Sequence, residues 1–155
     1  MKNLILVLFF IAISFTQYGC SVTSYTNIVS AAKNQNFLQV RSHFEKGANI
    51  NLSLLDWTAL HYGAYYQNIK IIKYLIEKGA DLNVQKSSNG FTPLHYAAYY
   101  GHARITKILV DAGAKTDIED DDGYTPLDYA EQYDFDKVIK ILNKDNKERS
   151  IDGKK

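Results

Sequence analysis

The sequence predicts an all-α solenoid, in which each stacked unit consists of a helix, a turn, a second helix and an extended polar loop. A short segment recurs along the chain, and its threonines, Thr58, Thr92 and Thr125, stand 34 and then 33 residues apart. A Gly-Ala step also recurs after each apolar helical segment, at spacings of 32 and 34 residues. With 155 residues, of which 46% are hydrophobic and 23% charged, the chain has the composition of a globular protein.

The first helix of each unit is predicted from the residues at its N-terminus. The recurring threonines are N-cap residues, whose side chains accept a hydrogen bond from the first turn. Pro93 and Pro126 follow directly at the first helical position, where a missing amide hydrogen costs nothing. Short helices are therefore predicted over residues such as 60–66 and 94–100.

The second helix of each unit is marked by apolar residues at helical spacing. These residues are Ile69, Ile71, Ile72, Leu75 and Ile76 in one unit, and Ile105, Ile108, Leu109 and Val110 in the next. Gly47, Gly79 and Gly113 then end these helices as left-handed caps. An extended polar loop leads from each cap to the next unit.

This pattern resembles the ankyrin repeat, whose T-P-L-H-x-A signature is nearly complete from Thr92 to Ala97. The resemblance implies an ankyrin-repeat solenoid with β-hairpin-like loops. We expect a capping repeat at 27–52, repeats at 53–86 and 87–119, and a C-terminal capping repeat at 120–143. Residues 144–155 form a charged tail that is expected to fray.

Three features depart from the family pattern. Gln67 and Asp134 stand where Gly101 supplies the glycine between paired helices, so a left-handed backbone would be strained there. The loop at 85–89 is one residue longer than its successor. A change in loop length is expected on the face from which the loops project.

Residues 1–19 resemble a secretory signal, with Lys2 near the start and an apolar run from 4 to 15. The run is shorter than the roughly 20 residues that span a membrane. Gly19-Cys20 resembles a bacterial lipoprotein cleavage box with Cys20 lipidated, although Gln17 departs from it. Cleavage after Ser14 and a buried N-terminal helix are the alternatives. With such a signal, residues 20–26 would be a short linker. The exported chain would be periplasmic or lipid-anchored to a membrane, or alternatively secreted.

Composition and motifs argue against most chemistry. A net charge of +1 offers no basic surface for nucleic acid, and one cysteine excludes internal disulfides and Cys-rich zinc sites. No catalytic, cofactor-binding or metal-binding motif is found, so the chain is predicted not to be an enzyme. The resemblance gives His61 and His95 a backbone-bonding role. The glycine after the acidic run 117–122 comes one residue late for a calcium loop, which leaves a negative loop tip.

The chain holds 12 tyrosines, and many fall where the ankyrin resemblance places contact residues. The predicted partner-binding residues are Trp57, Tyr65, Tyr66, Phe91, Tyr99, Tyr100, Tyr124 and Tyr133. Rigid rings with a polar handle are typical interface anchors, so a monomer binding an unidentified protein through its concave face is predicted. Tyr62, Tyr96 and Tyr129 are expected in the core. The alternatives are a structural envelope lipoprotein without a specific partner, and a tyrosine content raised only by coding bias.

Overall fold

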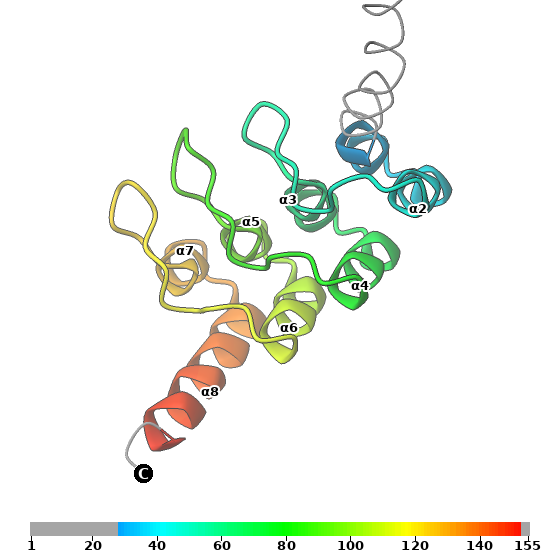
Figure 1. The fold of residues 1–155 in the computed structure, drawn as a ribbon. Coiled ribbons are helices and arrows are strands. Elements are labelled where there is room, and N and C mark those ends of the chain that lie inside the picture. Colours follow the sequence, from blue (N-terminus) through cyan, green and yellow to red (C-terminus); the bar gives the residue numbers. More distant parts are fainter. Residues whose placement is uncertain (1–27, 153–155) are drawn as a thin grey trace, which may run out of the picture.

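The computed structural model describes residues 28–152, in which consecutive helix pairs stack side by side (Figure 1). The helices are α2 (Phe37–Glu45), α3 (Ala59–Tyr65), α4 (Ile69–Glu77), α5 (Pro93–Tyr99), α6 (Ala103–Asp111), α7 (Pro126–Gln132) and α8 (Asp136–Asp152), preceded by a helical turn at 28–33. Helices α3, α5 and α7 form the inner row, and α4, α6 and α8 form the outer row. The predicted all-α solenoid is confirmed. The predicted signal, the linker and Cys20 lie outside the described residues.

The first helix of each complete unit begins as the sequence predicts. Thr58, Thr92 and Thr125 have extended backbones, and each side chain accepts a hydrogen bond from the third helical amide. Pro93 and Pro126 occupy the first helical position. The loops between units carry no strand within 28–152, although Leu54 and Trp57 form one isolated antiparallel bridge.

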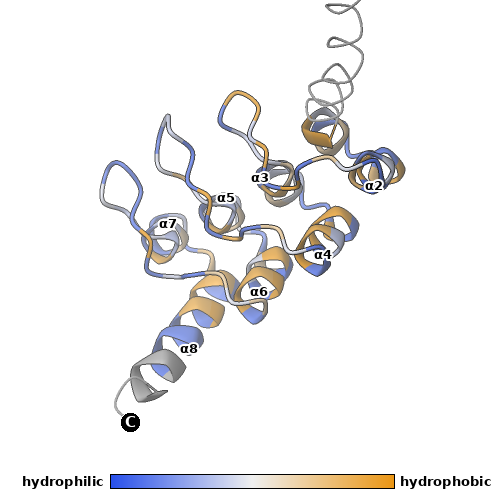
Figure 2. Ribbon diagram, in the orientation of Figure 1, coloured by the Kyte–Doolittle hydropathy of each residue, from blue (hydrophilic) through white to orange (hydrophobic). Residues whose placement is uncertain are grey.

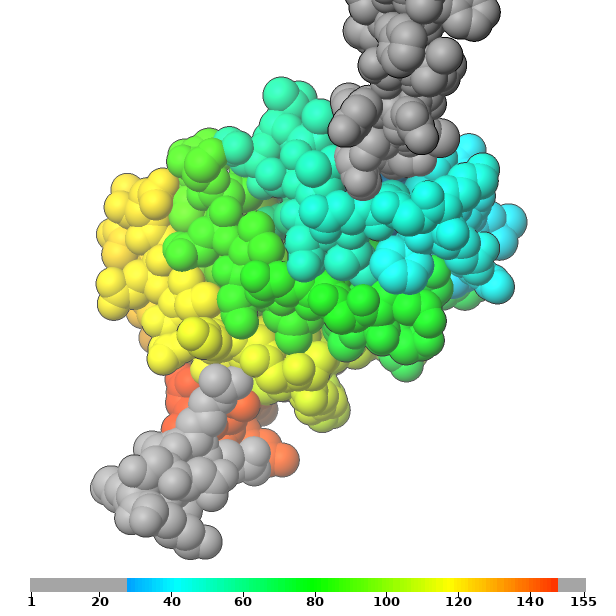
Figure 3. All heavy atoms as spheres, viewed as in Figure 1, coloured from blue at the N-terminus to red at the C-terminus, as the bar shows by residue number. Residues whose placement is uncertain are grey.

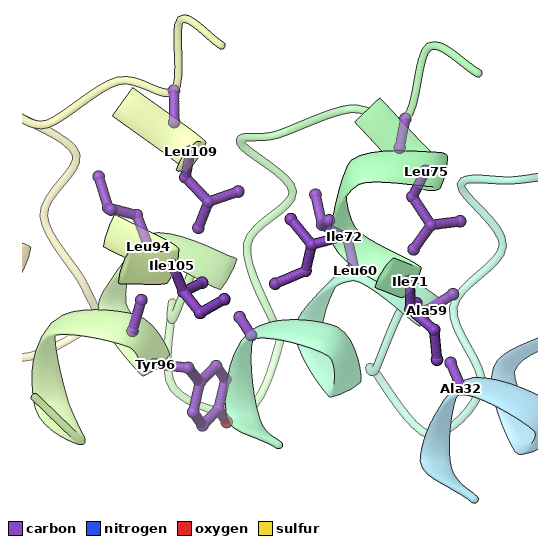
Figure 4. Close-up of a cluster of buried hydrophobic side chains, with 14 of the residues drawn as sticks. Ala32, Ala59, Leu60, Ile71, Ile72, Leu75, Leu94, Tyr96, Ile105 and Leu109 are labelled. Atoms are coloured by element: carbon purple, nitrogen blue, oxygen red, sulfur yellow. The ribbon is translucent and has the colours of Figure 1, made fainter. Parts of the chain in front are cut away.

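Apolar side chains fill the space between the two rows. Figure 2 shows hydrophobic and hydrophilic residues on different sides of α4 and α6. The close-up in Figure 4 shows Leu94 and Leu60 of the inner row beside Ile105 and Ile72 of the outer row. All four are at most 1% exposed. Because each unit packs mainly on its neighbours, the core is continuous along the stack.

The predicted histidine role is confirmed, and it joins successive repeats. The Nδ1 atom of His61 accepts from the Thr58 amide at 3.2 Å, and its Nε2 faces the Phe91 carbonyl at 3.1 Å. His95 makes the corresponding contacts with Thr92 and, at 3.1 Å, with the Tyr124 carbonyl. Nε2 must carry a hydrogen to donate to a carbonyl, and Nδ1 accepts an amide hydrogen and so carries none, which means that the rings are neutral.

Burial lowers the pKa of His61 to about 4 and also lowers the pKa of His95. In the last repeat Asp128 takes the histidine's place and closes the same cap with Thr125 at 2.7 Å. An ionised carboxylate has no donor with which to reach the carbonyl of a following repeat. The substitution therefore suits the end of the stack.

The corners between paired helices are left-handed, as predicted. Gln67 and Asp134 have φ values of 57° and 55°, close to the 67° of Gly101. A Cβ atom on Gly101 would meet the ring of Phe135 at 2.8 Å. Glycine is required at that corner by space as well as by its backbone.

The C-terminal helix is longer than predicted. The boundary expected at residue 143 falls inside α8, which continues to Asp152. Residues 144–152 contain neither glycine nor proline to end a helix. The hydroxyl of Thr116 also donates to Asp145 at 3.0 Å and to Asn146 at 2.8 Å, which ties the added turn to the third repeat.

Candidate protein-binding surface

The eight predicted contact residues all belong to the inner row and its loops. Trp57, Phe91 and Tyr124 directly precede the N-cap threonines of α3, α5 and α7. The other five lie at or just beyond the C-terminal ends of the same helices. In Figure 3 the loops of successive repeats pack side by side along one edge of the molecule. The repeat therefore brings these rings onto one side of the stack.

The rings that precede the helices are joined through a second set of rings. Trp57 lies 4.7 Å from Tyr96, and Tyr96 lies 5.2 Å from Phe91, measured between ring centroids. Phe91 in turn lies 5.2 Å from Tyr129, which lies 5.7 Å from Tyr124. The predicted row of tip rings thus has a helix tyrosine inserted at each step.

These inserted tyrosines test the core prediction. Tyr96 and Tyr129 are 6% and 8% exposed, which confirms that they are buried. Tyr62 is half-buried and packs against the hydrophobic core, so for this residue the prediction is confirmed only in part. Each buried tyrosine is covered by an aromatic ring from the preceding repeat's tip, Tyr96 by Trp57 and Tyr129 by Phe91.

The rings at the helix ends are staggered between repeats. Tyr65 lies 5.0 Å from Tyr100 of the next repeat, and Tyr99 lies 5.1 Å from Tyr133. Within one repeat Tyr99 and Tyr100 are also 5.0 Å apart. The predicted direct row of Tyr66, Tyr100 and Tyr133 is therefore replaced by a zigzag, in which most pairs meet edge to face.

Together these rings form one connected surface, here called the ring band. Its members are the eight predicted residues with Tyr62, Tyr96 and Tyr129. Tyr66, Tyr100, Tyr124 and Tyr133 are 38% to 49% exposed, whereas Trp57, Tyr65, Phe91 and Tyr99 are half-buried. The half-buried rings hold the exposed ones in place.

Sequence reasoning missed a cation in the ring band. The Lys86 ammonium lies 4.7 Å from the centroid of the Trp57 ring and 5.9 Å from that of Tyr96. A cation over an aromatic face is attracted by the negative potential of the ring. The signal in the sequence was the longer loop at 85–89, which contains this lysine.

The acidic loop tip is only partly available. Asp120 is 7% exposed, and it accepts from the Tyr129 hydroxyl at 2.5 Å and from the amides of Asp122 and Tyr124 at 2.9 Å. Burial opposes its charge, but these hydrogen bonds lower its pKa below the ordinary value. Asp120 therefore builds the loop, while Asp121 and Asp122 remain exposed.

Within residues 28–152 no group of three potential metal ligands is brought together. No helix in that part of the chain is long and apolar enough to cross a membrane. A hollow of about 410 Å³ lies between α2 and α4, away from the inner row, beside Phe37, Phe44 and Tyr74.

Stacked helix pairs with exposed aromatic rings along one side are typical of helical repeat solenoids that present a contact surface. Comparison with family models identifies the repeat itself. A model of ankyrin repeats in three copies matches residues 4–86, and a model of ankyrin repeats in many copies matches residues 63–110. The chain belongs to the ankyrin-repeat family, whose members generally mediate protein–protein interaction. A search of curated proteins returned no match.

Proposed function

We propose that this chain is a non-catalytic scaffold, exported from the cytoplasm, which binds a protein partner through the ring band. The observation that carries the proposal is the exposure of four tyrosines, Tyr66, Tyr100, Tyr124 and Tyr133, along one side of the stack. Each of them contacts another ring of the band. Four exposed rings on one side of the stack are more than a solenoid needs to fold.

Ring contacts make these tyrosines effective anchors. The ring centroid of Tyr65 lies 4.8 Å from that of Tyr66 and 5.0 Å from that of Tyr100, so both exposed rings already pack against a half-buried neighbour. Immobilising a flexible side chain at an interface costs about 0.5–1.5 kcal/mol. Rings that are ordered before binding avoid much of this cost, and central aromatic anchors typically contribute about 2 kcal/mol or more.

Export is supported by sequence alone. Lys2, the apolar run at 4–15 and Gly19-Cys20 favour a signal with lipidation at Cys20. A Cys20→Ala variant is then expected to leave the membrane fraction or to stay unprocessed, as judged by fractionation and mature mass. Wild-type behaviour of the variant in both measurements would contradict lipid anchoring.

Tyrosine protection tests the binding proposal against the alternative of a structural envelope lipoprotein. Surface tyrosines are modified chemically with and without a cell-envelope extract, and modified sites are located by mass spectrometry. Binding predicts protection of Tyr66, Tyr100, Tyr124 and Tyr133, while Tyr74 on the outer row serves as an internal control. Equal modification with and without the extract would favour the structural alternative.

A further inference from the structure

Two neighbouring loops place opposite charges at the same position in the ring band. The Lys86 amide donates to the Phe91 carbonyl at 2.9 Å, and the Asp120 amide donates to the Tyr124 carbonyl at 2.9 Å. Both residues therefore open the loop that ends at the tip ring. The side chain of Lys86 lies over Trp57 and Tyr96, whereas that of Asp120 accepts from Tyr129. The charge beside the rings changes sign from the third repeat to the fourth.

The segment 117–136, which makes up most of the fourth repeat, shares the negative sign. Between residues 117 and 136 the chain has no lysine or arginine, and its carboxylates are Asp117, Glu119, Asp120, Asp121, Asp122, Asp128, Glu131, Asp134 and Asp136. All except Asp120 are exposed. The ion pairs found within 28–152 join Arg41 to Glu45, Lys78 to Glu77 and Lys107 to Asp111, so none involves this segment.

These carboxylates act directly on the rings. The pKa of Tyr129 is raised strongly by burial, then by its hydrogen bond to Asp120, and further by the charges of Asp120 and Asp122. Exposed Tyr124 lies two residues after Asp122 in the loop, and exposed Tyr133 directly precedes Asp134 in the chain. At this end of the band, ring faces and uncompensated negative charge occur together.

Building on the proposed function, we propose that the fourth-repeat end of the ring band docks a lysine- or arginine-bearing segment of the protein partner. Tyr100, Tyr124 and Tyr133 supply ring faces for the cation and its aliphatic stem, as Trp57 does for Lys86. Asp122, Glu131 and their neighbours supply the charge that attracts it. Within the described residues, the cations found over rings lie over Trp57, Tyr74 and Tyr96, and none lies over these three tyrosines.

The electrostatic attraction is local. The chain carries a net charge of only +1, so a basic peptide is not drawn to the protein as a whole. The negative segment must therefore act at short range, within a Debye length of about 8 Å at physiological ionic strength. A variant that removes the same charge from the outer row is therefore an informative control.

Fluorescence anisotropy with defined peptides tests the inference. The probe is a labelled peptide of alternating arginine and serine, and its matched control replaces each arginine with glutamate. We expect the arginine peptide to bind and the glutamate peptide not to bind. Asp122→Asn combined with Glu131→Gln should weaken binding about tenfold at an ionic strength of about 0.01 M, and less at about 0.15 M.

The control variant removes the same number of negative charges from the outer row. Glu77→Gln combined with Asp111→Asn changes the net charge equally but leaves the fourth-repeat end intact, so binding should not change. Equal weakening by both double variants, or equal binding of both peptides, would overturn the inference. Circular dichroism on all variants checks that the helices are retained.

A second readout separates this inference from the proposed function. Partner capture from the envelope extract is compared for the acidic double variant and for Tyr66→Ala combined with Tyr100→Ala. Loss in both variants supports a basic partner segment. Loss in the tyrosine variant alone overturns the charge inference while the binding function stands, and retention in both overturns both.

Discussion

The inner and outer rows of helices share one core but present different surfaces. The outer helices α4 and α6 bury branched aliphatic side chains such as Ile72 and Ile105, and their surfaces carry ion pairs such as Lys107 with Asp111. The inner helices bury alanines, including Ala64 and Ala97, and expose tyrosines instead. The interior between the rows therefore holds the stack together, whereas the ring band extends along its open side.

A buried leucine should show the largest effect on folding. Leu94 of α5 is 0% exposed and lies between the rows. Leu94→Ala leaves a cavity there and is expected to cost about 2–5 kcal/mol of unfolding free energy, measured by denaturant unfolding. Tyr133→Ala, on the open side, is the comparison. An unchanged unfolding midpoint for Leu94→Ala would contradict the conclusion that the interior between the rows stabilises the stack.

Acid should loosen the stack through its histidine bridges. Burial lowers the pKa of His61 from 6.5 to about 4 in the folded protein. An unfolded chain binds the proton more readily, so this stability is fully present above pH 6.5 and is lost as the pH falls towards 4. The loss amounts to roughly 3 kcal/mol, which urea unfolding at several pH values measures. A His61→Asn variant should be less stable at pH 7 but less sensitive to acid, and an equal pH dependence would contradict the assignment.

The corner at Gly101 should tolerate no side chain. Gly101→Ala combines a φ of 67° with a Cβ that would meet Phe135 at 2.8 Å. Strain and contact together are expected to cost about 2 kcal/mol. Thermal unfolding measures this cost, and Gly113→Ala is the matched control, because it has positive φ but nothing within 4 Å of its Cβ. Equal losses in the two variants would show that Phe135 is not the cause.

The smallest effect on stability should be a gain. Gln67 holds a left-handed backbone at φ 57° without being glycine. In Gln67→Gly the relieved strain exceeds the added entropy of the unfolded chain, for a net stabilisation of about 0.5 kcal/mol. Differential scanning calorimetry measures the shift, and a lower midpoint would contradict the estimate of strain.

Sequence was sufficient for the repeats because each signal in them is local. The caps at Thr58 and Thr92, the prolines and the left-handed corners depend only on neighbouring residues, and the structure has them as predicted. The end of α8 was not predicted, because the contact of Thr116 with Asp145 spans 29 residues.

The ring band was predicted in its members but not in its connections. The positions of Trp57 and Tyr100 followed from the repeat, but the insertion of Tyr96 between tip rings depends on contacts between repeats. Lys86 was missed because cation placement over a ring depends on the path of a loop.

We propose that folding and binding reside in different parts of the molecule. Tyr66 and Tyr100 are 38% and 43% exposed, so truncating both should remove anchors for a partner and little of the core. The direct test measures the thermal midpoint and partner capture of Tyr66→Ala combined with Tyr100→Ala, with Lys107→Ala on the outer row as the control.

We expect the double tyrosine variant to keep its helical signal and nearly its full midpoint while losing partner capture, and the control to keep all three. An unfolded double variant would show that the rings belong to the core. A folded double variant that still captures the partner would place the contact surface elsewhere, and either result would contradict the separation of binding from folding.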